Sequence, residues 1–139
     1  MIDLAENAPP PKWLPLIVIP GALLLGAGAV IALAKPAMLV APGTEINSAV
    51  HVYAGYLVAR NLALALLLLV TLSMGARRSL STLMVLTAVI QVLDAAMDIV
   101  EGRWPLIPGV LVFAALFLFG ATRITGSPIW KAKAWREIA

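Results

Sequence analysis

The chain alternates between four long apolar runs and shorter segments that hold most of the polar residues. The runs cover about residues 13–34, 48–74, 80–100 and 106–122. An α-helix of about 20 apolar residues crosses the roughly 30 Å hydrocarbon core of a bilayer. Because the connections are short, consecutive helices are expected to be antiparallel neighbours. The pattern therefore predicts an all-α fold, a transmembrane antiparallel up-down four-helix bundle over residues 13–123.

The ends of the second and third helices can be read from local sequence. Gly75 is a plausible stop for the second helix, since glycine tolerates the left-handed conformation that ends many helices. Ser79 is a good N-cap for the third helix. Residues 1–12, before the first run, are acidic and rich in proline, and we expect them to be irregular.

The C-terminal tail, residues 124–139, predicts a short amphipathic helix at the membrane interface. Ser127 is its candidate N-cap and Pro128 would occupy its first position. Such a helix lies with its apolar face in the bilayer surface. That face would comprise Trp130, Ala134 and Ile138, and the opposite one Lys131, Lys133, Arg136 and Glu137. The alternative is a solvated tail without a fixed structure.

Composition supports a protein embedded in lipid and narrows its chemistry. Hydrophobic residues make up 62% of the chain and charged residues 12%, with a mean hydropathy of +0.99, whereas soluble proteins carry about 25% charged residues. The chain has no cysteine and one histidine, which excludes disulfides, thiolate chemistry and metal sites rich in Cys or His. No basic run interleaved with aromatics indicates nucleic-acid binding. We expect no metal and no cofactor.

The basic residues outside the apolar runs predict an orientation. Seven of them fall on the side shared by the N-terminus, the second connection and the C-terminus: Lys12, Arg77, Arg78, Arg123, Lys131, Lys133 and Arg136. The other side has Lys35 and Arg103. The positive-inside rule then places both termini in the cytoplasm. The expected location is a multi-pass protein of a bacterial inner membrane.

Three ionisable residues lie within the apolar runs. Arg60 lies near the middle of the second helix, and Asp94 and Asp98 lie in the third. A charge at mid-membrane costs at least about 2.5–3.5 kcal/mol, so it should be paired and face inward. Because the two helices are antiparallel, Arg60 and Asp94 fall at similar depth. We therefore predict that Arg60 and Asp94 meet.

Polar side chains follow one face on each of these two helices. On the third helix, spacings of 3, 4 and 3 place four of them within an arc of about 80°: Gln91, Asp94, Asp98 and Glu101. On the second helix an arc of about 60° holds Tyr53, Tyr56 and Arg60, with Asn61 beside it. The two faces are expected to enclose a polar cleft that is wettest at its extracytoplasmic end. Tyr56 would then meet Asp98 across the cleft.

Two interpretations of this cluster stay open. The Arg60–Asp94 pair could serve only to fix the register of two helices, as polar contacts do in membrane bundles. Alternatively, Asp94 neutralises Arg60 and leaves Asp98 in excess, and a surplus ionisable group inside a membrane is a functional-site hypothesis. In that case Asp98 and Asp94 are the candidate catalytic residues, and the candidate ligand-binding residues are Arg60, Tyr56, Tyr53, Gln91 and Asn61. His51 and Glu45 are expected to be solvated.

The segment from Tyr56 through Arg60, Asn61 and Leu62 to Ala65 resembles a known family motif. With the short basic loop and a third helix bearing Leu93-Asp94-Ala95-Ala96, residues 15–122 are similar to the small DoxX-like four-helix membrane proteins, in particular an uncharacterised group with an R-D-L-A-L-G motif. Asn61 stands where that group usually has Asp, and Ala65 where it usually has Gly. The resemblance implies a four-helix bundle. Some DoxX-like relatives are subunits of quinone-linked oxidoreductases.

Three functions are compatible with these features. The first is a site for a lipophilic small molecule that enters from the bilayer, with Arg60 orienting an oxygen or an anionic group and Asp98 serving acid–base chemistry of the isomerase, cyclase or epoxide-opening type. The second is a non-catalytic subunit or scaffold of a larger, quinone-linked membrane complex. The third is proton or cation transport by a homo-oligomer, with Asp94 and Asp98 as a relay.

Overall fold

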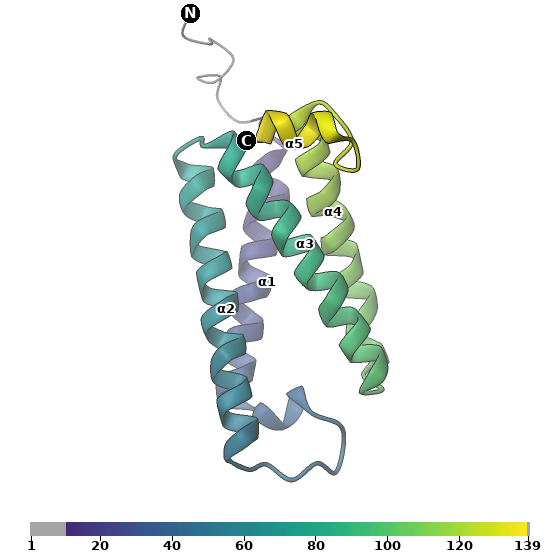
Figure 1. Cartoon of the computed structure of the whole chain (residues 1–139). Coiled ribbons are helices and arrows are strands. Elements are labelled where there is room, and N and C mark those ends of the chain that lie inside the picture. Colours follow the sequence, from purple (N-terminus) through teal and green to yellow (C-terminus); the bar gives the residue numbers. More distant parts are fainter. Residues whose placement is uncertain (1–10, 139) are drawn as a thin grey trace, which may run out of the picture.

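The computed structural model describes residues 11–138, and side chains as far as Arg136. Its helices are α1 (Leu14–Ala34), α2 (Ser48–Ser73), α3 (Arg77–Val100), α4 (Ile107–Thr125) and α5 (Ala132–Ile138), with two 3₁₀ turns, η1 (Pro36–Leu39) and η2 (Trp104–Leu106) (Figure 1). The predicted all-α, four-helix fold is confirmed. Most of the acidic segment expected to be irregular, residues 1–10, lies outside the described residues.

Four helices in the described part of the chain are long and apolar enough to cross a membrane. Many of their large apolar side chains, such as Leu16, Leu66 and Leu93, are exposed on the outside of the bundle. A soluble protein rarely presents so much contiguous apolar surface to water. The chain is therefore a multi-pass membrane protein.

The bundle is built from two helical pairs. α1 packs along α2 and α3 along α4, whereas contacts between α2 and α3 and between α1 and α4 are much fewer. α2 and α3 are close at the end where α5 lies and diverge toward the other end (Figure 1). We call the end near Trp13, Gly75 and α5 the tail end. The opposite end, with the 35–47 connection and the 101–103 turn, is the loop end.

The apolar core that joins the two pairs is confined to the tail-end half. Its largest fully buried side chain is Phe117 of α4, and the other members are Leu14, Val18, Ala22, Leu25, Leu64, Ala65, Leu68, Leu80, Met84, Val85, Ala88, Ala114 and Ala121. In the loop-end half the buried apolar side chains are Ala29, Ala32, Val50, Ala54 and Ala95. Four of these five are alanines, and an alanine side chain buries little apolar surface. Apolar burial therefore contributes little to holding the two pairs together at the loop end.

Two helix starts differ in how well the sequence predicted them. α2 begins at Ser48 as expected, and Asn47 caps it by accepting hydrogen bonds from Ala49 N at 3.1 Å and Val50 N at 3.2 Å. α3 begins at Arg77 rather than after Ser79, so the predicted cap is wrong. Gly75 has a φ of +66° and reverses the chain so quickly that the next helix starts two residues later.

The C-terminal tail forms a shorter helix than predicted. α5 begins at Ala132, and Pro128 lies in a preceding turn, because the indole Nε1 of Trp135 donates a 2.7 Å hydrogen bond to the carbonyl of Ile129. Ala134 is fully buried where α5 packs on α3 and α4, whereas Trp130 is exposed. The expected shared face of Trp130 and Ala134 is therefore not formed, and the side chain of Ile138 lies outside the described ones.

Candidate functional site

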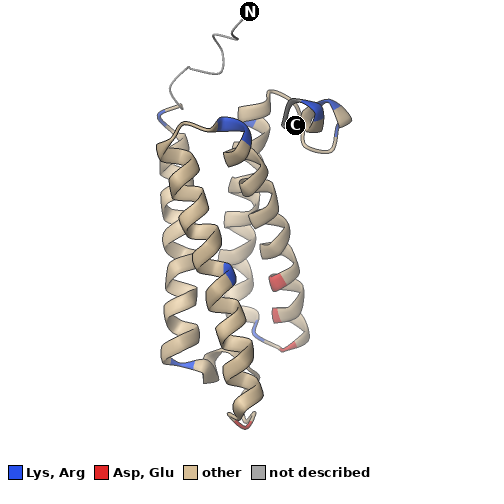
Figure 2. Ribbon diagram, turned by 60° about the vertical axis from the view of Figure 1, so that its left-hand side comes forward, with Lys and Arg blue, Asp and Glu red and all other residues tan. Residues whose placement is uncertain are grey.

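Arg60 and Asp94 form an ion pair between the two helical pairs. Arg60 Nη1 donates to Asp94 Oδ1 at 3.1 Å, and Nη2 donates to Oδ2 at 2.8 Å. The two N–H groups thus meet the two carboxylate oxygens in parallel, which is the strongest geometry available to an Arg–carboxylate pair. The predicted contact is confirmed, and it joins the middle of α2 to the last third of α3. Figure 2 shows the acidic residues of α3 toward the loop end of that helix.

The ion pair is not enclosed by the protein. The Arg60 side chain is 35% exposed and that of Asp94 is 40% exposed. Neither belongs to the apolar core. α2 and α3 diverge toward the loop end, which lies beyond that core (Figure 1). Hydrocarbon offers no hydrogen bonds. Within a membrane, the exposed edge of a charged pair is therefore energetically unfavourable unless water, a ligand or protein covers it.

Asn61 is buried and accepts from the Nε and Nη2 edge of the Arg60 guanidinium, next to the edge that Asp94 binds. Its Oδ1 accepts hydrogen bonds from Arg60 Nε and Nη2, both at 3.4 Å. Its Nδ2 lies close to α1, since a Cβ added to Gly28 would be 3.1 Å from it. Asn61 therefore fixes the orientation of Arg60 while packing against α1.

Asp98 does not remain in excess, and that expectation is corrected. Its Oδ1 lies 2.5 Å from Nη2 of Arg103, with side chains 8% and 16% exposed respectively. Gly102 has a φ of +71°, which folds the chain back so that Arg103 N donates to the carbonyl of Asp98 at 2.8 Å. Arg103 was expected only as a basic residue outside the apolar runs. The sequence does contain a signal for this pair. Asp98 lies one helical turn before Gly102, which ends the helix, and Arg103 directly follows that glycine.

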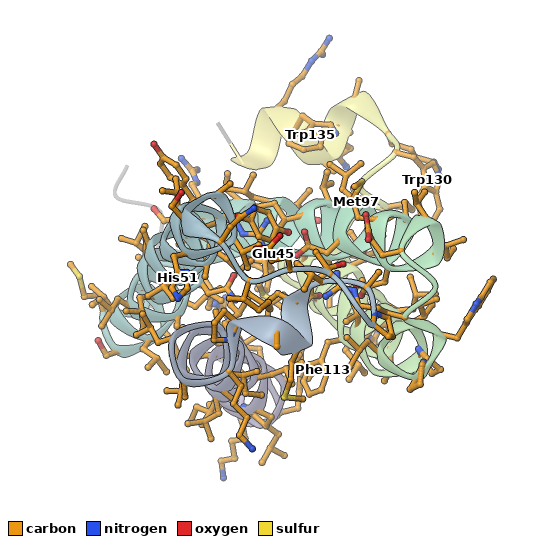
Figure 3. The ribbon with its side chains drawn as sticks, turned by 90° about the horizontal axis from the view of Figure 1, so that it is seen from below. Glu45, His51, Met97, Phe113, Trp130 and Trp135 are labelled. Carbon is orange, nitrogen blue, oxygen red and sulfur yellow. The ribbon has the colours of Figure 1, made fainter. Side chains whose placement is uncertain are left out.

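Arg103 also connects the two helical pairs at the loop end. Its Nη1 lies 3.5 Å from the carbonyl oxygen of Met38 in η1, a weak hydrogen bond at the limit of ordinary geometry. Seen from the loop end, η1 lies between the α1–α2 and α3–α4 pairs (Figure 3). Arg103 thus joins the end of α3 to the connection between α1 and α2.

The tyrosines on α2 do not face this cluster. Tyr53 is 51% exposed and Tyr56 is 74% exposed, and Asp98 bonds Arg103 instead of Tyr56. Glu101, the last of the four polar residues predicted to share one face of the third helix, is exposed as well. The expectation of two fully facing polar stripes is therefore wrong beyond Arg60 and Asp94. A tyrosine has an apolar ring and a polar tip, so its position in a polar stripe does not fix which way the helix is turned.

Gln91 adds a buried amide to the site. It lies one helical turn before Asp94 on α3, is 5% exposed, and its Oε1 has no hydrogen-bond partner. A buried unpartnered amide is unfavourable by about 1–3 kcal/mol. Ser81, ten residues earlier in the tail-end half, has a similarly buried and unpartnered Oγ. Ser81 therefore offers a matched reference for Gln91.

His51 and Glu45 lie apart from the ion pair. His51 Nδ1 is 3.0 Å from the carbonyl oxygen of Asn47, within the first turn of α2, and the side chain is exposed. Glu45 is exposed in the connection before α2, and Figure 3 shows both residues at the loop end. Neither forms a hydrogen bond with Arg60 or Asp94.

A small groove lies on another side of α3. It has a volume of about 160 Å³ and is lined by Ala88, Val89, Val92, Leu93 and Leu118. All five side chains are apolar, so this groove suits an acyl chain but contains none of the charged residues. Within residues 11–138, no group of three or more His, Asp and Glu residues is placed to hold a metal ion.

The site as a whole is one open ion pair, one enclosed ion pair and one amide whose carbonyl oxygen has no partner among residues 11–138, arranged along α3. It can bind a polar group, but both of its carboxylates are already engaged by arginines. Comparison with protein-family models, curated proteins and solved structures finds no match to the chain.

Proposed function

We propose that this membrane protein binds a lipophilic small molecule whose polar head covers the Arg60–Asp94 pair. The observation that carries the proposal is the exposure of this pair, 35% and 40%, between two helices that are long and apolar enough to span a membrane. A polar head group at the open edge would supply the hydrogen bonds that hydrocarbon lacks. The apolar body of the ligand would lie among the side chains of the diverging helices.

The loop-end half of the bundle favours a ligand over a purely structural pair. A pair that served only to fix helix register would be best enclosed by packed side chains, as Asp98 and Arg103 are. Arg60 and Asp94 instead lie beyond the apolar core, next to small buried residues such as Ala95. Ligand sites in helical bundles are commonly built between facing helices in this way.

The resemblance to DoxX-like proteins points to the same two residues. Arg60 and Asp94 are the polar positions of the similar motif, and they are the two side chains that meet between α2 and α3. We propose membership of that group on this ground. A link to quinone chemistry rests on analogy between folds alone.

Acid–base chemistry is a secondary part of the proposal. Asp94 and Asp98 each accept a charged hydrogen bond from an arginine, so proton transfer at either one requires that pair to open first. Asp94 is the more accessible of the two carboxylates. Binding needs no such step, and we therefore place binding first and an isomerase, cyclase or epoxide-opening activity second.

Native mass spectrometry of the protein released from lipid nanodiscs tests the binding proposal. The wild type should carry a small-molecule adduct that the double variant Arg60→Leu/Asp94→Leu has lost. The matched control is Thr87→Val, which removes a buried hydroxyl bonded within α3 to the Leu83 carbonyl at 2.7 Å. This control should retain the adduct. A wild type without an adduct, or an adduct kept by the double variant, would contradict the proposal; a wild-type dimer or larger complex without an adduct would favour the scaffold.

A further inference from the structure

We infer that the head group recognised at Arg60–Asp94 is an uncharged hydroxyl, so that the ligand class is a neutral lipophilic alcohol. This inference rests on the proposed function and specifies its ligand. Three features carry it: the balance of charges in the cluster, the hydrogen-bonding atoms left free by the ion pair, and the free amide of Gln91.

The charges of the site balance one to one. Arg60 is matched by Asp94 and Asp98 by Arg103. Asn61, which stands where the similar motif has an acidic residue, is neutral and leaves that balance undisturbed. An anionic or cationic head group would add an uncompensated charge to a region where each such charge costs at least about 2.5–3.5 kcal/mol. A neutral head adds none.

The ion pair leaves one donor and several acceptor positions free. A guanidinium has five N–H groups. Asp94 takes one from each terminal nitrogen, and Asn61 Oδ1 accepts from Nε and Nη2. One N–H on Nη1 therefore has no acceptor, while the adjacent Oδ1 of Asp94 keeps a free lone pair. A hydroxyl can accept from that N–H and donate to that oxygen, whereas a ketone or an ether can only accept.

Gln91 supplies a neutral hydrogen-bonding group one turn away. Its Oε1 is enclosed without a partner, and rotation about the terminal amide torsion, which is soft, exchanges the positions of Oε1 and Nε2. Either orientation can bond a hydroxyl, because a hydroxyl both donates and accepts. The amide therefore complements an alcohol without adding charge.

The test uses three photoactivatable probes that share one hexadecyl chain with a diazirine. The head of the first probe is a hydroxyl. The second carries its methyl ether, which lacks the donor, and the third carries its sulfate ester, which adds a permanent negative charge. The protein is held in phosphatidylcholine nanodiscs, whose lipid has no hydroxyl group, and labelling of α2 and α3 peptides is measured by mass spectrometry. The alcohol should label wild type about tenfold more than the ether or the sulfate, as expected for a hydrogen bond to a charged group.

Variants separate the ligand class from the existence of the site. Gln91→Leu, which keeps the side-chain size, should reduce alcohol labelling severalfold, and the matched control Ser81→Ala should leave it unchanged. Equal labelling by alcohol and ether, or stronger labelling by the sulfate, would overturn the hydroxyl assignment. If Arg60→Leu/Asp94→Leu abolishes that labelling, the lipophilic site itself still stands. If no probe labels wild type above that double variant, the proposed function fails as well.

Discussion

Gly21 of α1 lies directly against the ring of Phe117 of α4. A Cβ added at Gly21 would overlap Phe117 Cζ, and Phe117 is fully buried. This contact brings the backbone of α1 against the core of the other helical pair. Small residues allow such close approach between membrane helices.

Gly21→Ala should destabilise the bundle by about 1–3 kcal/mol, the usual range for overpacking a well-filled core. Gly120→Ala is the matched control, because its added Cβ would meet the terminal Cε of Met84, the far end of a flexible side chain. Its unfolding free energy should change much less. Unfolding in detergent followed by tryptophan fluorescence measures both, and equal losses would show that Phe117 is free to move aside.

Removing one member of the open ion pair should cost more than removing an ordinary interhelical hydrogen bond. Arg60→Leu strands Asp94, and breaking such a pair typically costs about 3–5 kcal/mol, against roughly 0.6 kcal/mol for an average polar contact between membrane helices. Arg60→Leu/Asp94→Leu should recover most of the loss. The check is thermal unfolding of Arg60→Leu, Asp94→Leu and the double variant; a double variant no better than the two single variants would mean that each residue has further essential partners.

Arg103→Leu should loosen the loop end without unfolding the tail end. It leaves the buried carboxylate of Asp98 unpaired and removes the contact to the Met38 carbonyl. Glu45, exposed in the same connection, then becomes more accessible to a protease that cleaves after glutamate. Cleavage after Glu45 should accelerate severalfold in nanodiscs, while the control Glu101→Gln should leave it unchanged. An unaltered cleavage rate in Arg103→Leu would show that Arg103 does not restrain the connection.

Labelling of introduced cysteines tests the proposed orientation. Lys and Arg gather at the tail end (Figure 2), and the positive-inside rule therefore predicts a cytoplasmic tail end. The chain has no cysteine, so each introduced thiol is the only target. Thr44→Cys at the loop end should react with an impermeant maleimide in intact cells, and Met74→Cys at the tail end should react only after lysis. The reverse labelling pattern would place the loop end of the bundle in the cytoplasm.

The helices and the central ion pair could be predicted because each follows from a local rule. The lengths of the apolar runs fix the membrane spans. In two antiparallel neighbouring helices, residues that are equally far from the same membrane surface lie at the same depth. These rules are enough to bring Arg60 to Asp94, a contact across 34 residues of sequence. They require no knowledge of how side chains pack.

The features that sequence reasoning missed depend on geometry beyond a single helix. The Asp98–Arg103 pair requires the reversal at Gly102, which brings a residue outside the helix back onto it. The outward direction of Tyr56 depends on how α2 is rotated against its neighbours. The divergence of α2 and α3 toward the loop end is an arrangement of whole helices, which no local pattern in either helix specifies (Figure 1).

The confinement of the apolar core to one half implies that the protein should not unfold as a single cooperative unit. Local opening is cheapest where few apolar contacts are lost, so backbone amides of 48–60 and 91–100 should exchange with solvent deuterium through partial opening that leaves Phe117 and its neighbours packed. A molecule held across Arg60 and Asp94 would provide the contacts that this half lacks, and binding to the closed form adds stability by mass action. Ligand occupancy would then make the two halves of the bundle exchange and unfold together.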